Sequence, residues 1–433
     1  MASNQHILIA GDEARKRPKV DRLSLTIISL AWRSLWRNKR RTWLTVAGVA
    51  FAVWLLIFGR SAQEGTFMTM VDNGARMMTG HMQVQHVGYE EDPGIENTVN
   101  LGNLIESIRI VPGVDHVSAR AHGFALVSQG ERSFGAQILG VDPEAEGQWS
   151  TLKGMLAQGR YPSAPGEAMI GATLARNLAL DVGSEMIVLG TALQGGVAAM
   201  SVQISGIFDM TQPELNRSLV VVHLDDFREA WAMSRNEAHT IIVVTQDVAA
   251  SDRALEIIRE KIDPNKQVLL GWRDLMPEVE QMMDMKSVST EVIFLVLAII
   301  VTFSVINTFM MVVFERTPEF GVLQAIGMQL KYLRWQLQIE AFMLSALGIA
   351  VGFGLSWALI LGVGDEGLPA PIPEDAEAFY ARFNMGTHIM LKFDWQAFRT
   401  ASWVFLIGIQ LGALLPGWRL RKLRPVDAIR QET

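Results

Sequence analysis

The sequence predicts an α-helical membrane protein with four transmembrane helices and a large α+β extracytoplasmic domain. One span precedes this domain and three follow it, a 1+3 arrangement in which the domain is inserted between the first two spans. Of the 433 residues, 49% are hydrophobic and only 19% are charged, and the mean hydropathy is +0.21. The apolar residues are concentrated in charge-free runs of bilayer length. A long polar segment, 61–290, separates the first span from the others.

The composition also excludes several classes of protein. The chain has no Cys, which removes thiol catalysis, Cys-ligated metals and redox motifs. Its net charge of -7 and its pI near 5.7 argue against nucleic acid as a partner, because nucleic-acid-binding domains are usually basic.

Transmembrane candidates are runs of at least about 18 residues without Asp, Glu, Lys or Arg. Five runs qualify: 42–59, 186–208, 292–314, 341–364 and 400–418. The run 186–208 contains four Gly and several Ser, Thr and Gln residues. We therefore expect it to form two strands, Met186–Leu189 and Val197–Phe208, around a Gly-Gly turn. The other four runs are predicted transmembrane helices, since a helix rises about 1.5 Å per residue and the hydrocarbon core is about 30 Å thick.

The basic residues near the span ends predict the orientation. Thirteen lie on one side and five on the other. The thirteen are Arg33, Arg37, Lys39, Arg40, Arg41, Arg316, Lys331, Arg334, Arg419, Arg421, Lys422, Arg424 and Arg430; the five are Arg60, Lys286, Arg382, Lys392 and Arg399. The positive-inside rule then predicts a cytoplasmic location for both termini. The first helix is expected to be an uncleaved anchor, because a polar and amphipathic lead of 41 residues precedes it.

The predicted organisation follows the chain in order. It comprises a cytoplasmic lead (1–41), the first span (42–60), an extracytoplasmic domain with membrane-proximal stalks (61–290), the second span (291–314), a cytoplasmic coupling segment (315–340), the third span (341–364), an extracytoplasmic loop (365–399), the fourth span (400–418) and a cytoplasmic tail (419–433).

The lead contains an amphipathic pattern. Apolar residues recur at helical spacing, with Arg33 and Arg37 on the flanks. They are Leu25, Ile28, Trp32, Leu35 and Trp36. The pattern predicts an interfacial helix on the cytoplasmic leaflet. The alternative is an extended start of the first span.

The segment 61–290 shows two β-α-β patterns, one at each end. The first has strands His81–His86 and Val114–Val127 with a helix near Asn103–Ile110 between them. The second has strands Thr240–Thr245 and Gln267–Leu270, with an intervening helix to Ile262 that Ser251 caps. They enclose a β-rich middle at about 130–230. This order predicts one half of the domain built from both ends of the segment and a second half inserted between them.

No catalytic motif is present in the sequence. There is no phosphate-binding loop, HExxH or G-x-S-x-G pattern. Four histidines lie close in sequence: His81, His86, His116 and His122. His81 and His86 are five residues apart on a predicted strand, so their side chains are expected to point to opposite faces. We interpret all four as polar surface residues. The four spans carry no charge, although ion-coupled carriers usually bury titratable groups. Energy for any work is therefore expected from another subunit, and no catalytic, cofactor or metal site is expected in this chain.

The cytoplasmic segment after the second span predicts a short helix. Thr317 can cap its N-terminus, Pro318 suits the first helical position, Glu319 favours the positive helix end, and Gly327 can adopt a left-handed stop. The helix would present Phe320, Leu323 and Ile326 to the cytoplasm, and the alternative is a membrane-parallel connector. The candidate docking residues are Glu315, Arg316, Thr317, Pro318, Glu319, Phe320, Gly321, Leu323, Ile326 and Gly327.

Methionines flank the external membrane surface on both stalks. Met68, Met70, Met77 and Met78 follow the first span, and Met276, Met282, Met283 and Met285 lead into the second. Met is flexible and polarizable, and it is frequent on surfaces that accept varied apolar partners. These residues are a candidate substrate path. The alternative is that they fill the contact between two packed stalks.

Two glycine pairs in the predicted spans permit close helix approach. Gly348 with Gly352, and Gly408 with Gly412, have small-x-x-x-small spacing. Such pairs support dimer contacts and intramolecular packing equally well.

Three segments resemble one family of ABC transporter permeases, which includes the macrolide-exporter (MacB-type), lipoprotein-releasing (LolC/E-type) and cell-division (FtsX-type) proteins. They are the entry to the first span, Ala31–Thr42; the segment Glu315–Gly327 with its continuation Gln338–Ala341; and the C-terminal pieces Pro416–Arg421 and Arg424–Arg430. Within the external domain, Leu139–Pro143 and Ile170–Ala175 resemble recurring strand and helix starts of the family. The chain departs from many relatives at Pro318, where they have a basic residue.

The resemblance implies a mechanism and partners. Family permeases dimerise, bind two cytosolic ATPases through the helix after the second span, and convert ATPase closure into movement of stalks and external domains. A chain without a fused ATPase would recruit a separate one, which binds the ATP and Mg²⁺. The implied partners are this ATPase dimer, a second permease copy or a paralogue, the lipid bilayer of the bacterial inner membrane, and a periplasmic carrier or adaptor.

Three function classes remain open. The first is ATP-driven extraction or export of a lipoprotein or another amphiphile, including efflux of a drug or peptide. The second is an envelope regulator that activates an external hydrolase by the same motion. The third is an enzyme or receptor unrelated to ATP. The large external domain favours the first over the second, and the missing catalytic motifs disfavour the third.

The orientation can be tested with a reporter enzyme that is active only outside the cytoplasm. Fusion after Gly130 should give activity, because the basic asymmetry places 61–290 outside. Activity from the same reporter fused at Lys331 would contradict the topology.

Overall fold

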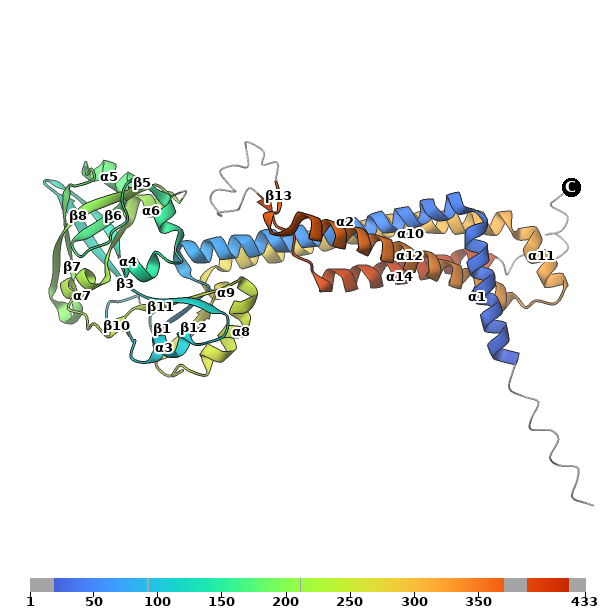
Figure 1. The fold of residues 1–433 in the computed structure, drawn as a ribbon, viewed down its shortest axis with the longest axis horizontal. Coiled ribbons are helices and arrows are strands. Elements are labelled where there is room, and N and C mark those ends of the chain that lie inside the picture. Colours follow the sequence, from blue (N-terminus) through green and yellow to red (C-terminus); the bar gives the residue numbers. More distant parts are fainter. Residues whose placement is uncertain (1–18, 92, 211, 370–387, 420–433) are drawn as a thin grey trace, which may run out of the picture. The chain divides into compact units, whose positions relative to one another are not determined.

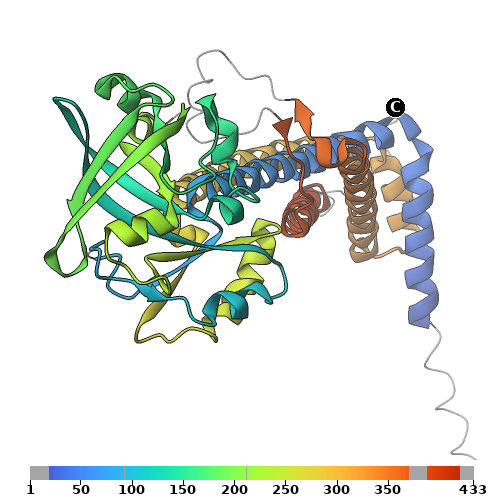
Figure 2. The ribbon, with the colours of Figure 1, turned by 60° about the vertical axis from the view of Figure 1, so that its left-hand side comes forward.

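The computed structural model describes residues 19–91, 93–210, 212–369 and 388–419. The chain divides into two compact units, which are described separately. The helical unit comprises 1–65, 286–368 and 390–433, and the α+β unit comprises 66–285 with 369–389. The predicted cytoplasmic tail and most of the loop 365–399 lie outside the described residues. Figure 1 labels the elements and Figure 2 gives a second view.

The helices and strands have the following bounds. The longer helices are α1 (Lys19–Arg37), α2 (Lys39–Gly74), α8 (Val248–Arg259), α10 (Pro277–Glu315), α11 (Thr317–Ala325), α12 (Leu330–Val363) and α14 (Trp395–Arg419), and a π-helical turn, η1, covers Ala75–Thr79. The shorter helices are α3 (Leu104–Arg109), α4 (Pro143–Glu146), α5 (Ala172–Leu178), α6 (Pro213–Ser218), α7 (Leu224–Ala230) and α9 (Trp272–Leu275). The main strands are β1 (Met82–His86), β3 (Val114–Gln129), β4 (Arg132–Val141), β5 (Leu156–Gly159), β6 (Glu167–Gly171), β7 (Glu185–Thr191), β8 (Val197–Phe208), β9 (Leu219–His223), β11 (Thr240–Thr245) and β12 (Gln267–Gly271).

Four of the described helices are long and apolar enough to cross a membrane: Lys39–Thr79, Pro277–Glu315, Leu330–Val363 and Trp395–Pro416. Each covers one of the four apolar runs that predicted a span, except for residue 364 of the third run and residues 417–418 of the fourth. The helices extend beyond those runs, because backbone hydrogen bonding continues through the charged residues at their ends. The fifth run, 186–208, forms β7 and β8, so its assignment to strands is confirmed.

The lead forms a helix distinct from the first long one. A turn at Asn38 separates α1 from α2, and α1 crosses the end of α2 instead of continuing it (Figures 1 and 2). The alternative of an extended first span is therefore wrong. Ala31 and Leu35 are buried, whereas Trp32 is 50% exposed, which agrees with an amphipathic helix over the part whose side chains are described. The side chain of Leu25 lies outside that part.

The glycine pairs lie at contacts between helices of this chain. A Cβ on Gly348 would meet Val49 of α2 at 2.6 Å, and one on Gly352 would meet the carbonyl of Ala50 at 2.6 Å. A Cβ on Gly408 would meet Thr302 of α10 at 2.9 Å. On Gly412 it would lie 2.8 Å from Ile306. These faces are thus occupied by intramolecular packing.

The α+β unit is organised around β3. The N-terminal part of this strand pairs with β11, which continues through β1 to β12. The C-terminal part pairs with β4 on one side and β7 on the other. The order β3-β4-β9-β6-β8-β7 then returns to β3, so six strands close into a ring. The strands of the two β-α-β patterns lie side by side in the order β12-β1-β11-β3, as expected for a half built from both ends of the segment. The middle of the segment supplies the other five strands of the ring. The two halves nevertheless share one hydrogen-bonded sheet.

One helix start differs from the expectation. Asp247, not Ser251, caps α8, and its carboxylate accepts a hydrogen bond of 2.6 Å from the backbone N–H of Ala250. Ser251 lies inside the helix, where its hydroxyl donates to the carbonyl of Val248 at 2.6 Å. Both residues are helix-capping types, and the helix begins at the earlier one.

Helix α7 covers the interior of the ring with two aromatic side chains. The rings of Phe227 and Trp231 stack with centroids 4.2 Å apart, and both are buried. Glycine in the strands makes room for this stack, because a Cβ on Gly140 would lie 2.8 Å from Phe227. Stacked aromatic rings at this position fill the core.

Replacing Gly171 by Ala should destabilise the α+β unit. A Cβ at this position would lie 2.6 Å from the Cα of Asn216, a backbone atom that cannot give way by side-chain rotation. We expect a loss of about 1–3 kcal/mol, as for overpacked cores, measured as a lower thermal unfolding midpoint. Gly135→Ala is the matched control, because nothing lies within 4 Å of its added Cβ. Equal effects of the two changes would contradict the packing argument.

Candidate functional site

The predicted coupling segment, 315–340, contains α11, a helix of nine residues, and the first turns of α12. Pro318 is the second residue of α11, one position later than expected, because the helix begins at Thr317. At the other end Gly327 has φ +99°, and the N–H of Met328 donates to the carbonyl of Leu323 at 2.9 Å. This is the hydrogen bond of a Schellman stop. The expected left-handed end of the helix at Gly327 is therefore confirmed.

Two further details of this helix were predicted wrongly. Thr317 does not cap it, because the N-cap position belongs to Arg316, and the Thr317 hydroxyl donates to the carbonyl of Val313 at 2.8 Å. Phe320 does not face outward. It is 3% exposed and belongs to the hydrophobic core of the helical unit. Its burial is reasonable, because a phenyl ring gains more by packing under the helix than by contacting water.

The outward face of α11 consists of other residues. Ile326 is 79% exposed and Val322 is 48% exposed, while the side chain of Glu319 is 47% exposed. Leu323 is half-buried, and Gly321 is buried. Residues 319, 322 and 326 lie on one side of a helix. This face presents one carboxylate and two aliphatic side chains, and Val322 was not among the residues expected there.

A buried ion pair attaches the start of α11 to α12. Arg316 Nη1 lies 3.2 Å from Glu340 Oε1, and the two side chains are 7% and 4% exposed. Gln336 Nε2 donates to the same oxygen at 3.2 Å. Charges removed from water in this way require each other, because a lone buried charge costs several kcal/mol.

Two further ion pairs lie nearby, one between α2 and the end of α10 and one between α1 and α11. Arg41 Nη1 lies 2.6 Å from Glu315 Oε2, and Arg37 Nη1 lies 2.7 Å from Glu319 Oε1. From the sequence alone both arginines are only markers of orientation. Their partners were missed because about 280 residues separate them along the chain, and no local pattern reports such a pair. The available signal was the pair of carboxylates, Glu315 and Glu319, at the expected cytoplasmic end of the second span.

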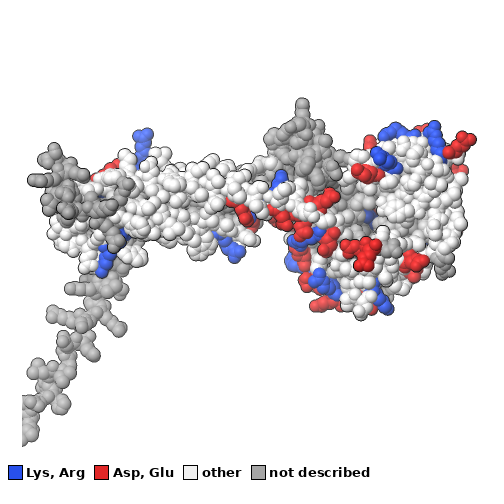
Figure 3. All heavy atoms as spheres, turned by 180° about the vertical axis from the view of Figure 1, so that it is seen from behind, with Lys and Arg blue, Asp and Glu red and all other residues white. Residues whose placement is uncertain are grey.

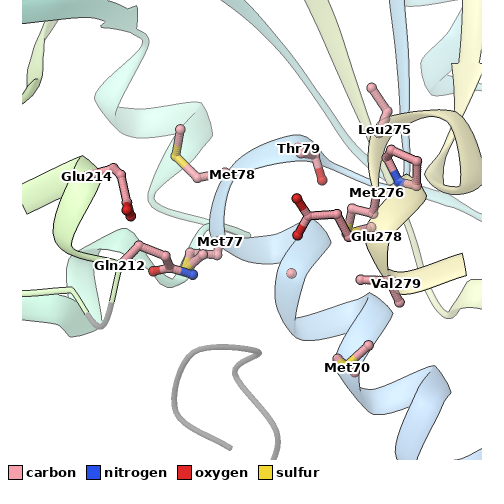
Figure 4. Close-up of a pocket in the computed structure, with 12 residues that line it drawn as sticks. Met70, Met77, Met78, Thr79, Gln212, Glu214, Leu275, Met276, Glu278 and Val279 are labelled. Carbon is pink, nitrogen blue, oxygen red and sulfur yellow. The ribbon is translucent and has the colours of Figure 1, made fainter. Parts of the chain in front are cut away.

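The methionine residues divide between a cavity and a packed cluster in the α+β unit. Met70, Met77, Met78 and Met276 line a cavity of about 370 Å³ (Figure 4). Met68, Met282 and Met283 pack, together with Met276, against a buried cluster that includes Met70 itself and Phe67, Val71, Val248, Trp272 and Val279. Met285 is 68% exposed. The packing contact is thus present for some of these residues, and the substrate path stays a prediction.

The histidines near the start of the domain are not all surface residues. His81 is fully buried, with Nε2 3.1 Å from a carboxylate oxygen of Asp72, and its Nδ1 accepts a hydrogen bond of 3.2 Å from Thr245 N–H. His122 packs beside His239. Burial lowers the pKa of His122 to about 3 and the pKa of His239 to about 4. Both are therefore neutral near pH 7.

Nothing in the described part of the chain is arranged to hold a metal. No group of three or more His, Asp and Glu side chains there has the required geometry. Figure 3 shows charged side chains over the visible face of the α+β unit and few over the long helices of the helical unit. The described surface of those helices is thus suited to lipid.

Two family models match the chain. An FtsX-like permease C-terminal domain matches residues 291–425, and a MacB-like periplasmic core domain matches residues 42–261.

Individual relatives agree with these matches. The lipoprotein-releasing system transmembrane protein LolC of Xylella fastidiosa is 22% identical over 405 residues, which cover 90% of this chain and 93% of that protein. The macrolide export ATP-binding/permease protein MacB of Bdellovibrio bacteriovorus is 22% identical over 93% of this chain. The chain spans only 61% of the length of that MacB. The periplasmic region of MacB from Actinobacillus actinomycetemcomitans superposes with a TM-score of 0.35 and 12% identity, covering 46% of this chain and 92% of that one.

The buried ion pair can be tested by removing one charge or both. Arg316→Met leaves Glu340 unpaired and should lower the free energy of unfolding by about 3–5 kcal/mol. Adding Glu340→Met removes the unpaired charge and should recover most of this loss. Hydrogen exchange at the amides of α11 reports the effect as faster exchange in the single variant. Arg37→Met is the matched control, because its exposed ion pair contributes at most about 1 kcal/mol. Similar exchange in all four proteins would contradict the anchoring role.

Proposed function

This chain belongs to the family of ABC transporter permeases that combine an FtsX-like permease domain with a MacB-like periplasmic core domain, and from that premise we propose a specific role. It is the permease subunit of a transporter powered by a separate cytosolic ATPase dimer. ATP hydrolysis there drives extraction or export of a lipoprotein or another amphiphile at the outer face of the bacterial inner membrane. A second copy or a paralogue of this chain completes the transporter.

The attachment of α11 is the observation that carries the proposal. This helix has an exposed face formed by Glu319, Val322 and Ile326 and a buried side anchored by Phe320. Arg316, just before the helix, pairs with Glu340 of α12, and Glu319 pairs with Arg37 of α1. A force applied to the exposed face is thereby delivered to α12 and to α1. This is the property required of a segment that receives ATPase motion.

The proposed topology places one span before the α+β unit and three after it. The order of the four long apolar helices along the chain supports this arrangement. The basic residues Arg37 and Arg41 beside α11 support a cytoplasmic location for that end of the helical unit. Both termini then lie in the cytoplasm, and the α+β unit lies outside. The ATP and Mg²⁺ bind to the partner ATPase, and this chain has no catalytic site of its own.

Transport is favoured over a purely regulatory role by the cavity in the α+β unit. An envelope regulator that only transmits force to an external hydrolase needs no internal binding site. The cavity lined by Met70, Met77 and Met276 has the size and the lining of a site for an apolar group. The names of the relatives, which refer to lipoprotein release and macrolide export, support an amphiphilic substrate.

Charge reversal at Glu319 tests the coupling role. Glu319→Lys should abolish permease-dependent stimulation of the ATPase while leaving the permease inserted, because it reverses the charge at the helix start and on the exposed face. ATP hydrolysis by the co-purified complex in proteoliposomes measures the effect. Normal complex formation and normal stimulation would show that the ATPase docks elsewhere.

Two control variants separate docking from internal pairing. Arg37→Glu combined with Glu319→Lys restores the internal ion pair but keeps the exposed charge reversed, so the double variant should remain uncoupled. Glu106→Lys reverses an exposed carboxylate in α3, within the α+β unit, and should stay coupled. Recovery of stimulation in the double variant would assign Glu319 to internal pairing instead of docking.

A further inference from the structure

The cavity in the α+β unit has an apolar floor. Met70 is 1% exposed and Met77 is 8% exposed, and Met276 adds a third thioether to the lining. The volume of about 370 Å³ falls within the range of about 300–1,000 Å³ that is usual for small-molecule sites. Met side chains adapt to ligands of different shape, because their three torsions rotate freely.

Two carboxylates line the same cavity from different elements. Glu214 belongs to α6 and Glu278 to the first turn of α10, and both are exposed to solvent. Figure 4 shows them on either side of Met77. The lining contains no Lys, Arg or His, and neither carboxylate has an ion-pair partner among the described residues. The rim therefore carries two carboxylates that no described Lys, Arg or His contacts.

We propose that this cavity binds a cationic amphiphile, in which an apolar chain or ring system carries an ammonium group. The apolar part lies against the methionine floor, and the ammonium group lies between Glu214 and Glu278. Attraction between opposite charges favours this orientation. An anionic amphiphile of the same size is repelled by the two carboxylates.

The backbone on one side of the cavity explains how it stays open. The π-helical turn η1 provides Met77 and Met78, and such turns are frequent at functional sites. Gly74 lies just before this turn, where a Cβ would be 3.0 Å from the Sδ of Met276. A larger residue at position 74 would push the Met276 side chain into the cavity. The absence of a side chain there preserves the space.

This inference deepens the proposed transport function and rests on it for the biological role of the site. Binding itself requires neither ATP nor the ATPase. A failure to bind would overturn the ligand assignment and leave the coupling role of α11 intact. A failure of coupling would leave the binding result unchanged.

Photolabelling of the full-length chain in phosphatidylcholine nanodiscs tests the proposal. The probe is a diazirine-bearing dodecylammonium ion, and the comparison probe is the carboxylate of equal chain length. Mass spectrometry maps the labelled peptides. We expect saturable labelling of peptides that contain Met70–Thr79 or Met276–Val279, about tenfold stronger for the ammonium probe and weaker at high salt. Equal labelling by the two probes, or none at these peptides, would overturn the proposal.

Variants assign the labelling to the cavity. Glu214→Gln combined with Glu278→Gln should reduce ammonium labelling about tenfold. Each exposed ion pair with the ammonium group raises the binding affinity by up to about fivefold. Gly74→Leu should reduce labelling by both probes, because Met276 then fills the space. Glu106→Gln and Gly135→Leu are the matched controls. Glu→Gln changes keep the size of the side chains and therefore the cavity. Undiminished ammonium labelling of the double variant contradicts the proposal, even if Gly74→Leu reduces labelling.

Discussion

The buried ion pair between Arg316 and Glu340 is the interaction on which the helical unit depends most. It joins the residue before α11 to the middle of α12, and both side chains are almost fully removed from solvent. Such a pair adds little net stability, but loss of either partner is costly. Its consequence is therefore geometric, because α11 cannot leave α12 without exposing an unpaired charge to a poorly hydrated environment. The outer pair of Arg37 with Glu319 extends the same constraint to α1, and the pair of Arg41 with Glu315 joins α2 to the end of α10.

The α+β unit uses the same device. Arg120 on β3 and Glu146 on α4 are 1% and 0% exposed and form an ion pair. Arg120 also donates to the carbonyl of Met78 in η1, so one guanidinium joins the central strand to the turn beside the methionine-lined cavity. A displacement of η1 therefore acts directly on β3. This strand is part of the ring and also pairs with β11, through which it is joined to β1 and β12. The cavity and the sheet are thus mechanically connected within this unit.

Much of the fold was predictable from the sequence because it follows from local patterns. Charge-free runs identified the four long helices, and glycine with polar residues identified β7 and β8 as strands. The closure of the ring was not predictable, because it requires β7 to pair with β3, far away in sequence. The candidate site shows the same division. Gly327 ends α11 by local geometry, whereas the burial of Phe320 and the partners of Arg37, Arg41 and Arg316 depend on tertiary packing. Thr317 and Ser251 failed as caps because a neighbouring residue took the position.

The ion pairs around α11 predict that this helix moves together with α1. The absence of Cys in the natural chain allows spin labels at Arg33→Cys and Ala325→Cys, both at exposed positions outside the ion pairs. Double electron–electron resonance on complexes with one labelled copy would measure their separation with and without ATP bound to a hydrolysis-deficient ATPase. We expect the same distance distribution in both states. A shift of the distribution on ATP binding would contradict this prediction, because α11 would then move relative to α1.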